Sequence, residues 1–131
     1  MMEAFVMDSS AMLAIALGER RGKQAERAIL ANPGRCYIHS INAYEVACRL
    51  MSDGVDFVEA WKAAAFGGVR RLNFISLDMS LRAVRLKYAR RDLSLGDCHC
   101  LAFAEEVDGT LLTTDSRLAL ASKIVKTVHL Q

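Results

Sequence analysis

Short apolar runs alternate along the chain with longer segments whose apolar residues recur at helical spacing. The runs predict five strands, at residues 4–8, 36–40, 73–78, 110–115 and 123–130. The segments between them predict helices at residues 9–18, 22–31, 41–52, 55–66, 80–91, 94–107 and 116–122. Residues suited to capping precede three of these helices, namely Ser40, Asp78 and Ser94.

Strands that alternate with helices, each strand being a nearly continuous apolar run, indicate a parallel sheet covered on both faces. We therefore predict an α/β protein, a three-layer α/β/α sandwich with a central parallel sheet of four to five strands. The length of 131 residues fits one domain, residues 1–131. In such folds the functional crevice lies beyond the carboxyl ends of the strands.

Composition narrows the possible environments and partners. Hydrophobic residues make up 53% of the chain and charged residues 24%, which is typical of a globular protein. A net charge of +2 is too small to indicate nucleic-acid binding by composition, and the apolar runs are far shorter than a membrane span. Cys36, Cys48, Cys98 and Cys100 follow no regular framework, and the start lacks a signal sequence. We expect a cytoplasmic protein without a membrane partner.

Two predicted strands end in aspartate, Asp8 after "AFVM" and Asp115 after "TLLTT". If these strands lie near each other in a parallel sheet, both carboxylates emerge at the same edge. Each aspartate also fits a simpler interpretation, because aspartate between a strand and a helix is a common helix cap.

Asp97 and Glu45 lie on predicted helices. Asp97 in "SLGD" fits a capping box with Ser94, yet its helical face is otherwise apolar or small and has no basic residue one turn away. Glu45 fits a surface pair with Arg49 four residues on. The competing hypothesis is that both carboxylates are held for chemistry, since a carboxylate on an apolar face needs a cation or loses its charge.

Four carboxylates in one crevice repel one another unless cations neutralise them. Oxygen-only ligands suit Mg²⁺ or Mn²⁺ rather than zinc. Such an ion orients a phosphate and lowers the pKa of a bound water. The acidic set therefore favours metal-dependent hydrolysis of a phosphoester.

Four segments, "FVMDSSAML", "SINAYEVACRL", "LSLGDCHCLAFA" and "LLTTDSRL", resemble in order and spacing the motifs of PIN-domain ribonucleases, and most closely the small VapC-type toxins of toxin-antitoxin pairs. The resemblance covers almost the whole chain. It implies a PIN-like fold, cleavage of single-stranded RNA, a homodimer and a cognate antitoxin that silences the enzyme.

The resemblance also implies roles for individual residues. Asp8, Glu45, Asp97 and Asp115 match the acidic residues that bind Mg²⁺ or Mn²⁺ in the family. In addition, the hydroxyl residues Ser10 and Thr113 match positions that hold carboxylates or metal-bound waters from behind. The chain departs from the usual pattern at 98–100, where small apolar residues are commoner, which puts the local packing in question.

The run "CHC" at 98–100 suggests zinc at first sight. On a helix Cys98 and Cys100 lie about 200° apart and cannot converge on one ion, so we interpret them as buried thiols. His99 is interpreted as a partly exposed helix residue. Basic residues at 19–23, 70–71 and 82–91 are expected mainly on solvated faces, with a few available to an RNA backbone.

The predicted helix around 43–51 is apolar on more than half its circumference, and the segment beyond it carries the only tryptophan, Trp61. Such breadth indicates burial on two sides. Either the helix is a well-covered core element, or its second side is a dimer seam or an antitoxin-binding groove.

Three further functions stay open on the residues alone. The first is a PIN-type RNA-processing nuclease without an antitoxin. The second is a phosphatase with Asp8 as nucleophile, although "DSS" lacks the second aspartate common in such loops. The third is a non-catalytic domain whose acidic edge binds a metal or a basic peptide.

Overall fold

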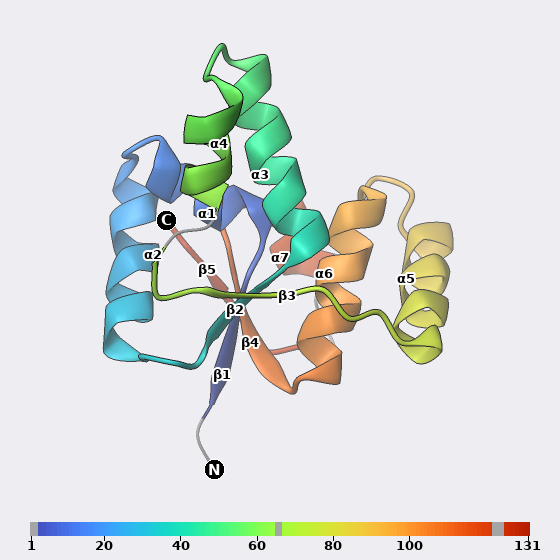
Figure 1. Cartoon of the computed structure of the whole chain (residues 1–131). Helices are drawn as coiled ribbons and strands as arrows, with labels where there is room; N and C mark the ends of the chain where they lie inside the picture. The colour runs from blue at the N-terminus through green and yellow to red at the C-terminus, as the bar shows by residue number, and fades with distance from the viewer. Residues whose placement is uncertain (1–2, 65–66, 122–124) are drawn as a thin grey trace.

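Five parallel strands form the centre of the molecule in the order β3-β2-β1-β4-β5 (Figure 1). The computed structural model describes residues 3–64, 67–121 and 125–131. The strands are β1 (Ala4–Met7), β2 (Cys36–His39), β3 (Arg70–Leu72), β4 (Gly109–Thr113) and β5 (Thr127–His129). The helices are α1 (Ser9–Ala16), α2 (Arg20–Ala31), α3 (Ser40–Ser52), α4 (Phe57–Ala64), α5 (Leu77–Ala89), α6 (Leu95–Glu106) and α7 (Ser116–Ala121).

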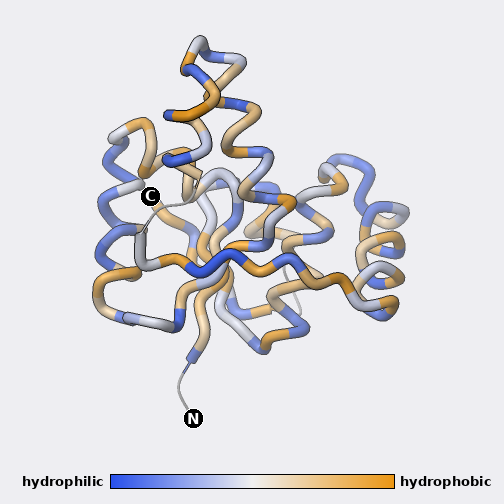
Figure 2. The backbone as a smooth tube through the Cα atoms, viewed as in Figure 1, coloured by the Kyte–Doolittle hydropathy of each residue, from blue (hydrophilic) through white to orange (hydrophobic). Residues whose placement is uncertain are grey.

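Helices cover both faces of the sheet, so the predicted three-layer α/β/α sandwich is confirmed. Successive residues of a strand point to opposite faces. In β1, Met7 packs into an apolar cluster with α1, α2, α3 and α4, whereas Val6 packs into a second cluster with α5, α6 and α7. Apolar segments gather along the central strands, and polar segments occupy the outer faces of the helices (Figure 2).

The central strands are set in register by their neighbours. Met7 of β1 pairs with Leu112 of β4, and the backbone N–H of Asp8 donates to the carbonyl of Leu112 at 3.2 Å. On the other side, Val6 pairs with Tyr37 of β2. The ends of β1, β2 and β4 therefore emerge together at one edge of the sheet.

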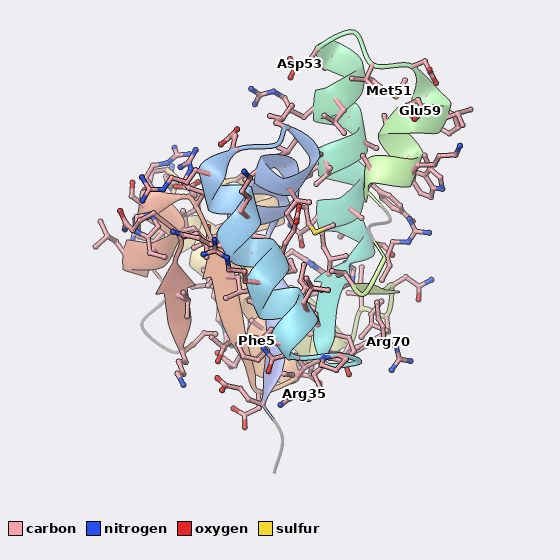
Figure 3. The ribbon with its side chains drawn as sticks, turned by 90° about the vertical axis from the view of Figure 1, so that its left-hand side faces the viewer. Phe5, Arg35, Met51, Asp53, Glu59 and Arg70 are labelled. Atoms are coloured by element: carbon pink, nitrogen blue, oxygen red, sulfur yellow. The ribbon has the colours of Figure 1, made fainter. Side chains whose placement is uncertain are left out.

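Helices α3 and α4 form a hairpin that projects beyond the sheet, with Met51, Asp53 and Glu59 towards its tip (Figure 3). The inner side of α3 is buried, as the apolar breadth predicted, through Ala43, Val46, Ala47 and Leu50. The other side is only half covered, because Tyr44 is 46% exposed and stacks on Trp61 of α4.

Close packing of α1 on α2 depends on Gly22. A Cβ atom at this position would lie 2.3 Å from the carbonyl oxygen of Ala14, which is far inside van der Waals contact. The missing side chain therefore allows the two helix backbones to approach each other.

The predicted strand at 73–78 is wrong, because pairing with β2 involves Arg70–Leu72 instead. The apolar residues that suggested the strand lie at the surface, since Phe74, Ile75 and Leu77 are 44%, 51% and 77% exposed. Ser76 rather than Asp78 caps α5, accepting a hydrogen bond from the Met79 N–H.

Other boundaries differ by smaller amounts. His39 caps α3 through Nδ1, which accepts from the Ile41 N–H at 3.2 Å, so that Ser40 is the first helical residue rather than the cap. β5 is shorter than the predicted strand at 123–130. The predicted ends of two helices, at 65–66 and at 122, and the start of that strand, at 123–124, lie outside the described residues.

Candidate functional site

Asp8 follows β1 and is 2% exposed. Its Oδ1 accepts the Ala11 N–H at 2.8 Å and so caps α1. Thr113 at the end of β4 donates its hydroxyl to Asp8 Oδ2 at 2.5 Å, and Ser10 Oγ lies 2.8 Å from both carboxylate oxygens. Capping fixes one oxygen, and the two hydroxyls fix the plane of the carboxylate. The capping and functional interpretations of Asp8 are therefore compatible.

The same two hydroxyls tie Asp8 to the segment after β4. Ser10 Oγ accepts the Thr114 N–H at 3.0 Å, and Thr113 Oγ1 accepts the Asp115 N–H at 3.0 Å. Each hydroxyl thus accepts from the backbone on one side and donates to Asp8 on the other. Ser10 and Thr113 thus link the Asp8 carboxylate to the backbone after β4.

Asp97 lies in the first turn of α6 and forms the predicted capping box with Ser94. Its N–H donates to Ser94 Oγ at 3.0 Å, and its Oδ2 accepts the Ser94 N–H at 3.1 Å. The side chain is thereby oriented by a reciprocal pair of hydrogen bonds. The helix start fixes the position of this carboxylate, just as capping does for Asp8.

Glu45 points from α3 towards the start of α6. Asn42 Nδ2 donates to Glu45 Oε1 at 2.9 Å and to the Gly96 carbonyl at 3.1 Å. A Cβ atom on Gly96 would lie 2.5 Å from Glu45 Oε2, so the carboxylate packs directly against the glycine. The surface pair with Arg49 does not form; Arg49 pairs with Asp53 instead.

The charge of Asp97 affects the ionisation of both Asp8 and Glu45. Burial, with a smaller contribution from the charge of Asp97, raises the pKa of Asp8 from 3.8 to about 6 against the hydrogen bonds that lower it. Burial also raises the pKa of Glu45, again with a contribution from Asp97. The pKa of the Cys100 thiol is raised by burial and then by the charges of Asp8, Asp97 and Glu45.

Asp115 is placed differently from the other three acidic residues. Its Oδ1 accepts the N–H groups of Arg117 and Leu118 at the start of α7, and its Oδ2 lies 3.5 Å from the Arg117 guanidinium. Its backbone is linked to Asp8 through Thr113, but its carboxylate faces Arg117. The structure therefore brings Asp8, Glu45 and Asp97 together and leaves the Asp115 side chain in an ion pair beside them.

The donor set suits a hard divalent cation. Asp8, Glu45 and Asp97 offer only carboxylate oxygens, and a bound cation would offset the repulsion by Asp97 that contributes to the raised pKa values of Asp8 and Glu45. Across residues 3–64, 67–121 and 125–131, however, no group of three or more His, Cys, Asp or Glu side chains is placed so that it could hold a metal ion.

The prediction for His99 is wrong: it is 6% exposed rather than partly exposed. Its ring meets that of His39 edge-on, with 4.3 Å between the centroids. His39 Nδ1 accepts a hydrogen bond and its Nε2 donates to the Phe74 carbonyl at 2.9 Å, so His39 is neutral. Burial lowers the pKa of His99. The predicted burial of Cys98 and Cys100 is confirmed.

Asn42, Gly96 and the two histidines were not among the predicted site residues. Asn42 has a sequence signal, since it lies three residues before Glu45 on one helical face. Gly96 has none, because its role is to leave space for a side chain 51 positions away in the chain, at residue 45.

No described helix is long and apolar enough to cross a bilayer.

Comparison with known proteins identifies the fold. The family model of the PIN domain matches residues 5–124. A toxin-antitoxin complex from Klebsiella pneumoniae is similar with a TM-score of 0.73 and 23% identity over 98% of both chains. VapBC-1 from nontypeable Haemophilus influenzae has a TM-score of 0.74 and 13% identity, over 97% of this chain and 98% of that one.

A third similar structure is that of VapC20 from Mycobacterium tuberculosis, described as a toxin that cleaves the sarcin-ricin loop. It has a TM-score of 0.71 and 18% identity, over 90% of this chain and 95% of that one. Comparison with curated proteins gives no significant match. At these identities the solved structures establish a shared fold.

Proposed function

The chain belongs to the PIN-domain family, and from that membership we propose that it is a Mg²⁺- or Mn²⁺-dependent endoribonuclease that cleaves single-stranded RNA. One observation carries the proposal. Asp97 lies near enough to Asp8 and to Glu45 for its charge to raise the pKa of each, and no Lys or Arg of the described residues forms an ion pair with any of the three. One buried carboxylate and two half-buried ones without a cation in the protein favour a cation from solution.

The residues of the chain would position the ion and the substrate. Asp8 and Asp97 would bind the ion with carboxylates already oriented by capping hydrogen bonds. Glu45, held by Asn42 against Gly96, would complete the shell or hold a second ion. When bound, the ion offsets the charge of the phosphate and activates a water molecule. Asp115 would join after turning away from Arg117.

Asp8 as a phosphorylated nucleophile has less support. Both of its oxygens accept hydrogen bonds, and the side chain is 2% exposed. A nucleophile needs a free lone pair directed at phosphorus. As an ion ligand, Asp8 needs one lone pair directed at the ion but no direct access to phosphorus.

We further propose that the enzyme is the toxin of a toxin-antitoxin pair and acts as a homodimer in the reducing cytoplasm. The similar structures described as toxin-antitoxin complexes favour an antitoxin partner. Half-exposed Tyr44 and Met51 on α3 and exposed Phe57 on α4 favour this hairpin as a surface for a second protein chain. The four cysteines are free, which suits a reducing compartment.

Neutral isosteres of the carboxylates test the nuclease proposal. We expect Asp8→Asn or Asp97→Asn to lower cleavage of a fluorescently labelled single-stranded RNA by about a thousandfold or more, because an ion ligand is lost. The matched control is Glu105→Gln at the far end of α6, which we expect to keep activity within about twofold. Circular dichroism monitors the fold.

Full activity in either aspartate variant would overturn the assignment of the site. Undiminished cleavage after removal of divalent ions with EDTA would overturn the metal dependence. Binding of Mn²⁺ without turnover of any RNA would favour the non-catalytic alternative.

A further inference from the structure

A cavity of about 380 Å³ adjoins the acidic site in the cleft between α3, α5 and α6. Glu45 and Gly96 belong to its wall and to the acidic site at the same time. Ile41, Ile75 and Val84 supply apolar walls, and Ser80 and His99 also line the cavity. A mainly apolar cavity with a few polar groups beside a reactive centre is typical of a site for part of a small ligand or substrate.

His99 is the unusual residue of this cavity. It is 6% exposed, and neither ring nitrogen has a hydrogen-bond partner within the described part of the chain. Most buried polar groups are paired, and leaving one unpaired destabilises the folded state. His39 supports the ring edge-on but offers it no hydrogen bond, since both of its own nitrogens are used. Because the χ2 torsion of histidine is broad, a small rotation of the ring presents a nitrogen to a ligand.

A second hollow of about 410 Å³ continues from the first along α5 and α6. Val84 and Leu95 line both hollows, and Lys87, Tyr88 and Arg91 line the outer one. Tyr88 is 76% exposed, and the guanidinium of Arg91 lies 5.5 Å from the centroid of its ring. An exposed aromatic ring with a basic neighbour is the usual platform for stacking a base of single-stranded nucleic acid.

We propose that this groove binds the nucleotides next to the scissile phosphate, with one unpaired base in the inner cavity against His99 and a neighbouring base on Tyr88. The inference rests on the nuclease function proposed above and gives it a substrate-recognition site. With a phosphate at Asp8, Glu45 and Asp97, the adjacent base lies beside the cavity wall that Glu45 and Gly96 share with the acidic site.

A base fits the groove better than an apolar side chain of a partner protein. A neutral imidazole provides one donor and one acceptor, which the polar edge of a base can satisfy and an apolar side chain cannot. The outer hollow carries Lys87 and Arg91 and no acidic residue, which suits a polyanion. The apolar walls are compatible with the faces of a base, which are themselves apolar.

Single-stranded RNAs that lack one base test the proposal directly. We would map the cleavage site and prepare substrates with an abasic nucleotide at each neighbouring position. Loss of the base bound in the cavity is expected to lower kcat/KM of the wild-type protein about tenfold to a hundredfold. Equal cleavage of intact and abasic substrates at every position would overturn the proposal.

Two variants assign the effect to the groove. His99→Phe keeps a ring and removes both nitrogens, so it should lower kcat/KM for intact RNA by about tenfold and leave the abasic substrate within about twofold. Tyr88→Ala should behave likewise towards the neighbouring base, and Leu30→Ala, 78% exposed on α2, is the control that changes neither. If these side chains had only a structural role, the variants would lower kcat/KM for the intact and the abasic substrate equally, which would contradict the proposal. Tyr88→Ala alone decides the matter if His99→Phe does not fold.

The inference and the nuclease function fail in different ways. If the wild-type protein cleaves no RNA, the proposed function fails. Fluorescence anisotropy in Mg²⁺ then measures binding of the same RNAs to the protein. The groove proposal requires that one abasic RNA binds at least about tenfold more weakly than the intact RNA. If the variants change the molecular mass in light scattering and leave base discrimination intact, the groove is an interface between protein chains and the proposal is wrong.

Discussion

The two ends of α6 carry acidic clusters that are neutralised in opposite ways. At the last turn, Glu105 and Glu106 join Asp78 around Arg82, with 2.6 Å from the guanidinium to Glu105 and to Asp78 and a direct contact to Glu106. At the first turn, Asp97 faces Asp8 and Glu45, and none of the three pairs with a described Lys or Arg. One cluster holds its own cation, and the other has no basic partner among the described residues.

The difference separates a stabilising network from a reactive one. The cluster around Arg82 joins α5 to α6 and is complete without a ligand. The cluster around Asp97 raises the pKa of Asp8 and of Glu45 by burial and mutual repulsion, so its charged state is costly without a cation. Three carboxylates alone do not identify a site; three carboxylates with no positive partner do.

The largest effect that sharpens this comparison concerns the stability of the metal-free protein. The pKa of Asp8 is raised from 3.8 to about 6 by burial, so the folded state binds this proton more tightly than the unfolded state. The contribution of Asp8 to stability is therefore greatest below about pH 3.8, falls as the pH rises to about 6, and is constant above that. The difference corresponds to about 3 kcal/mol at pH 7.

Asp8→Asn removes this cost and should raise the free energy of unfolding at pH 7 by about 1–3 kcal/mol while abolishing cleavage. Near pH 4 the variant and the wild type should be nearly equal. Urea denaturation at both pH values in EDTA measures this. Added Mn²⁺ should stabilise the wild type at pH 7 and not the variant. A variant less stable than the wild type at pH 7 would show that the carboxylate does not strain the fold.

The next effect concerns the contact between Gly96 and Glu45. Gly96→Ala places a Cβ atom 2.5 Å from Glu45 Oε2, so the carboxylate must move. We expect cleavage to fall about tenfold to a hundredfold, the usual cost of disturbing a group that supports a metal site. Stability should not fall in parallel, because alanine favours a helix over glycine by about 1 kcal/mol.

Gly67→Ala is the matched control for this substitution, since a Cβ there meets nothing within 4 Å. Initial rates of RNA cleavage and thermal melting separate the two effects. If Gly96→Ala cleaves RNA as fast as the wild type, the position of Glu45 against residue 96 does not matter for cleavage.

The sequence predicts the parts of the fold that depend on burial. β1, β2 and β4 are apolar because both of their faces are covered, and the alternation of such runs with helices indicates a parallel sheet. The same rule fails at 73–78, where the apolar residues lie at the surface beyond the short edge strand β3. Hydrophobic periodicity reports apolar surface, whether the molecule buries it in its core or exposes it.

The candidate site, like the fold, can be predicted only in part from the sequence. Asp8 and Asp97 sit at helix starts that local patterns reveal, and the family resemblance links them to Glu45 and Asp115. The space that Gly96 leaves for Glu45 and the burial of His99 against His39 arise from contacts between α3, α6 and the end of β2. No local pattern encodes them. The contact of Asp115 with Arg117 is also not predicted from the sequence. Within a helix, residues two apart do not face each other, but Asp115 lies just before α7, where its side chain can reach Arg117.

The smallest expected effect concerns the cluster around Arg82 at the last turn of α6. Arg82→Met removes the shared cation from three acidic side chains, two of which are one-third exposed. We expect the free energy of unfolding to fall by about 1–2 kcal/mol, more than for an ordinary surface pair because the Arg82 side chain is only 20% exposed. Cleavage of RNA should be unchanged. Urea denaturation and initial rates measure the two quantities.

Arg85→Met, at an exposed position on the same helix, is the control and should change stability by less than about 0.5 kcal/mol. If repulsion among the acids causes the loss in Arg82→Met, 1 M salt should reduce it, because screening weakens the repulsion. A loss of cleavage in Arg82→Met would mean that α6 transmits a change from its last turn to Asp97 at its first. The internally neutralised cluster would then belong to the function as much as the one that needs a cation from solution.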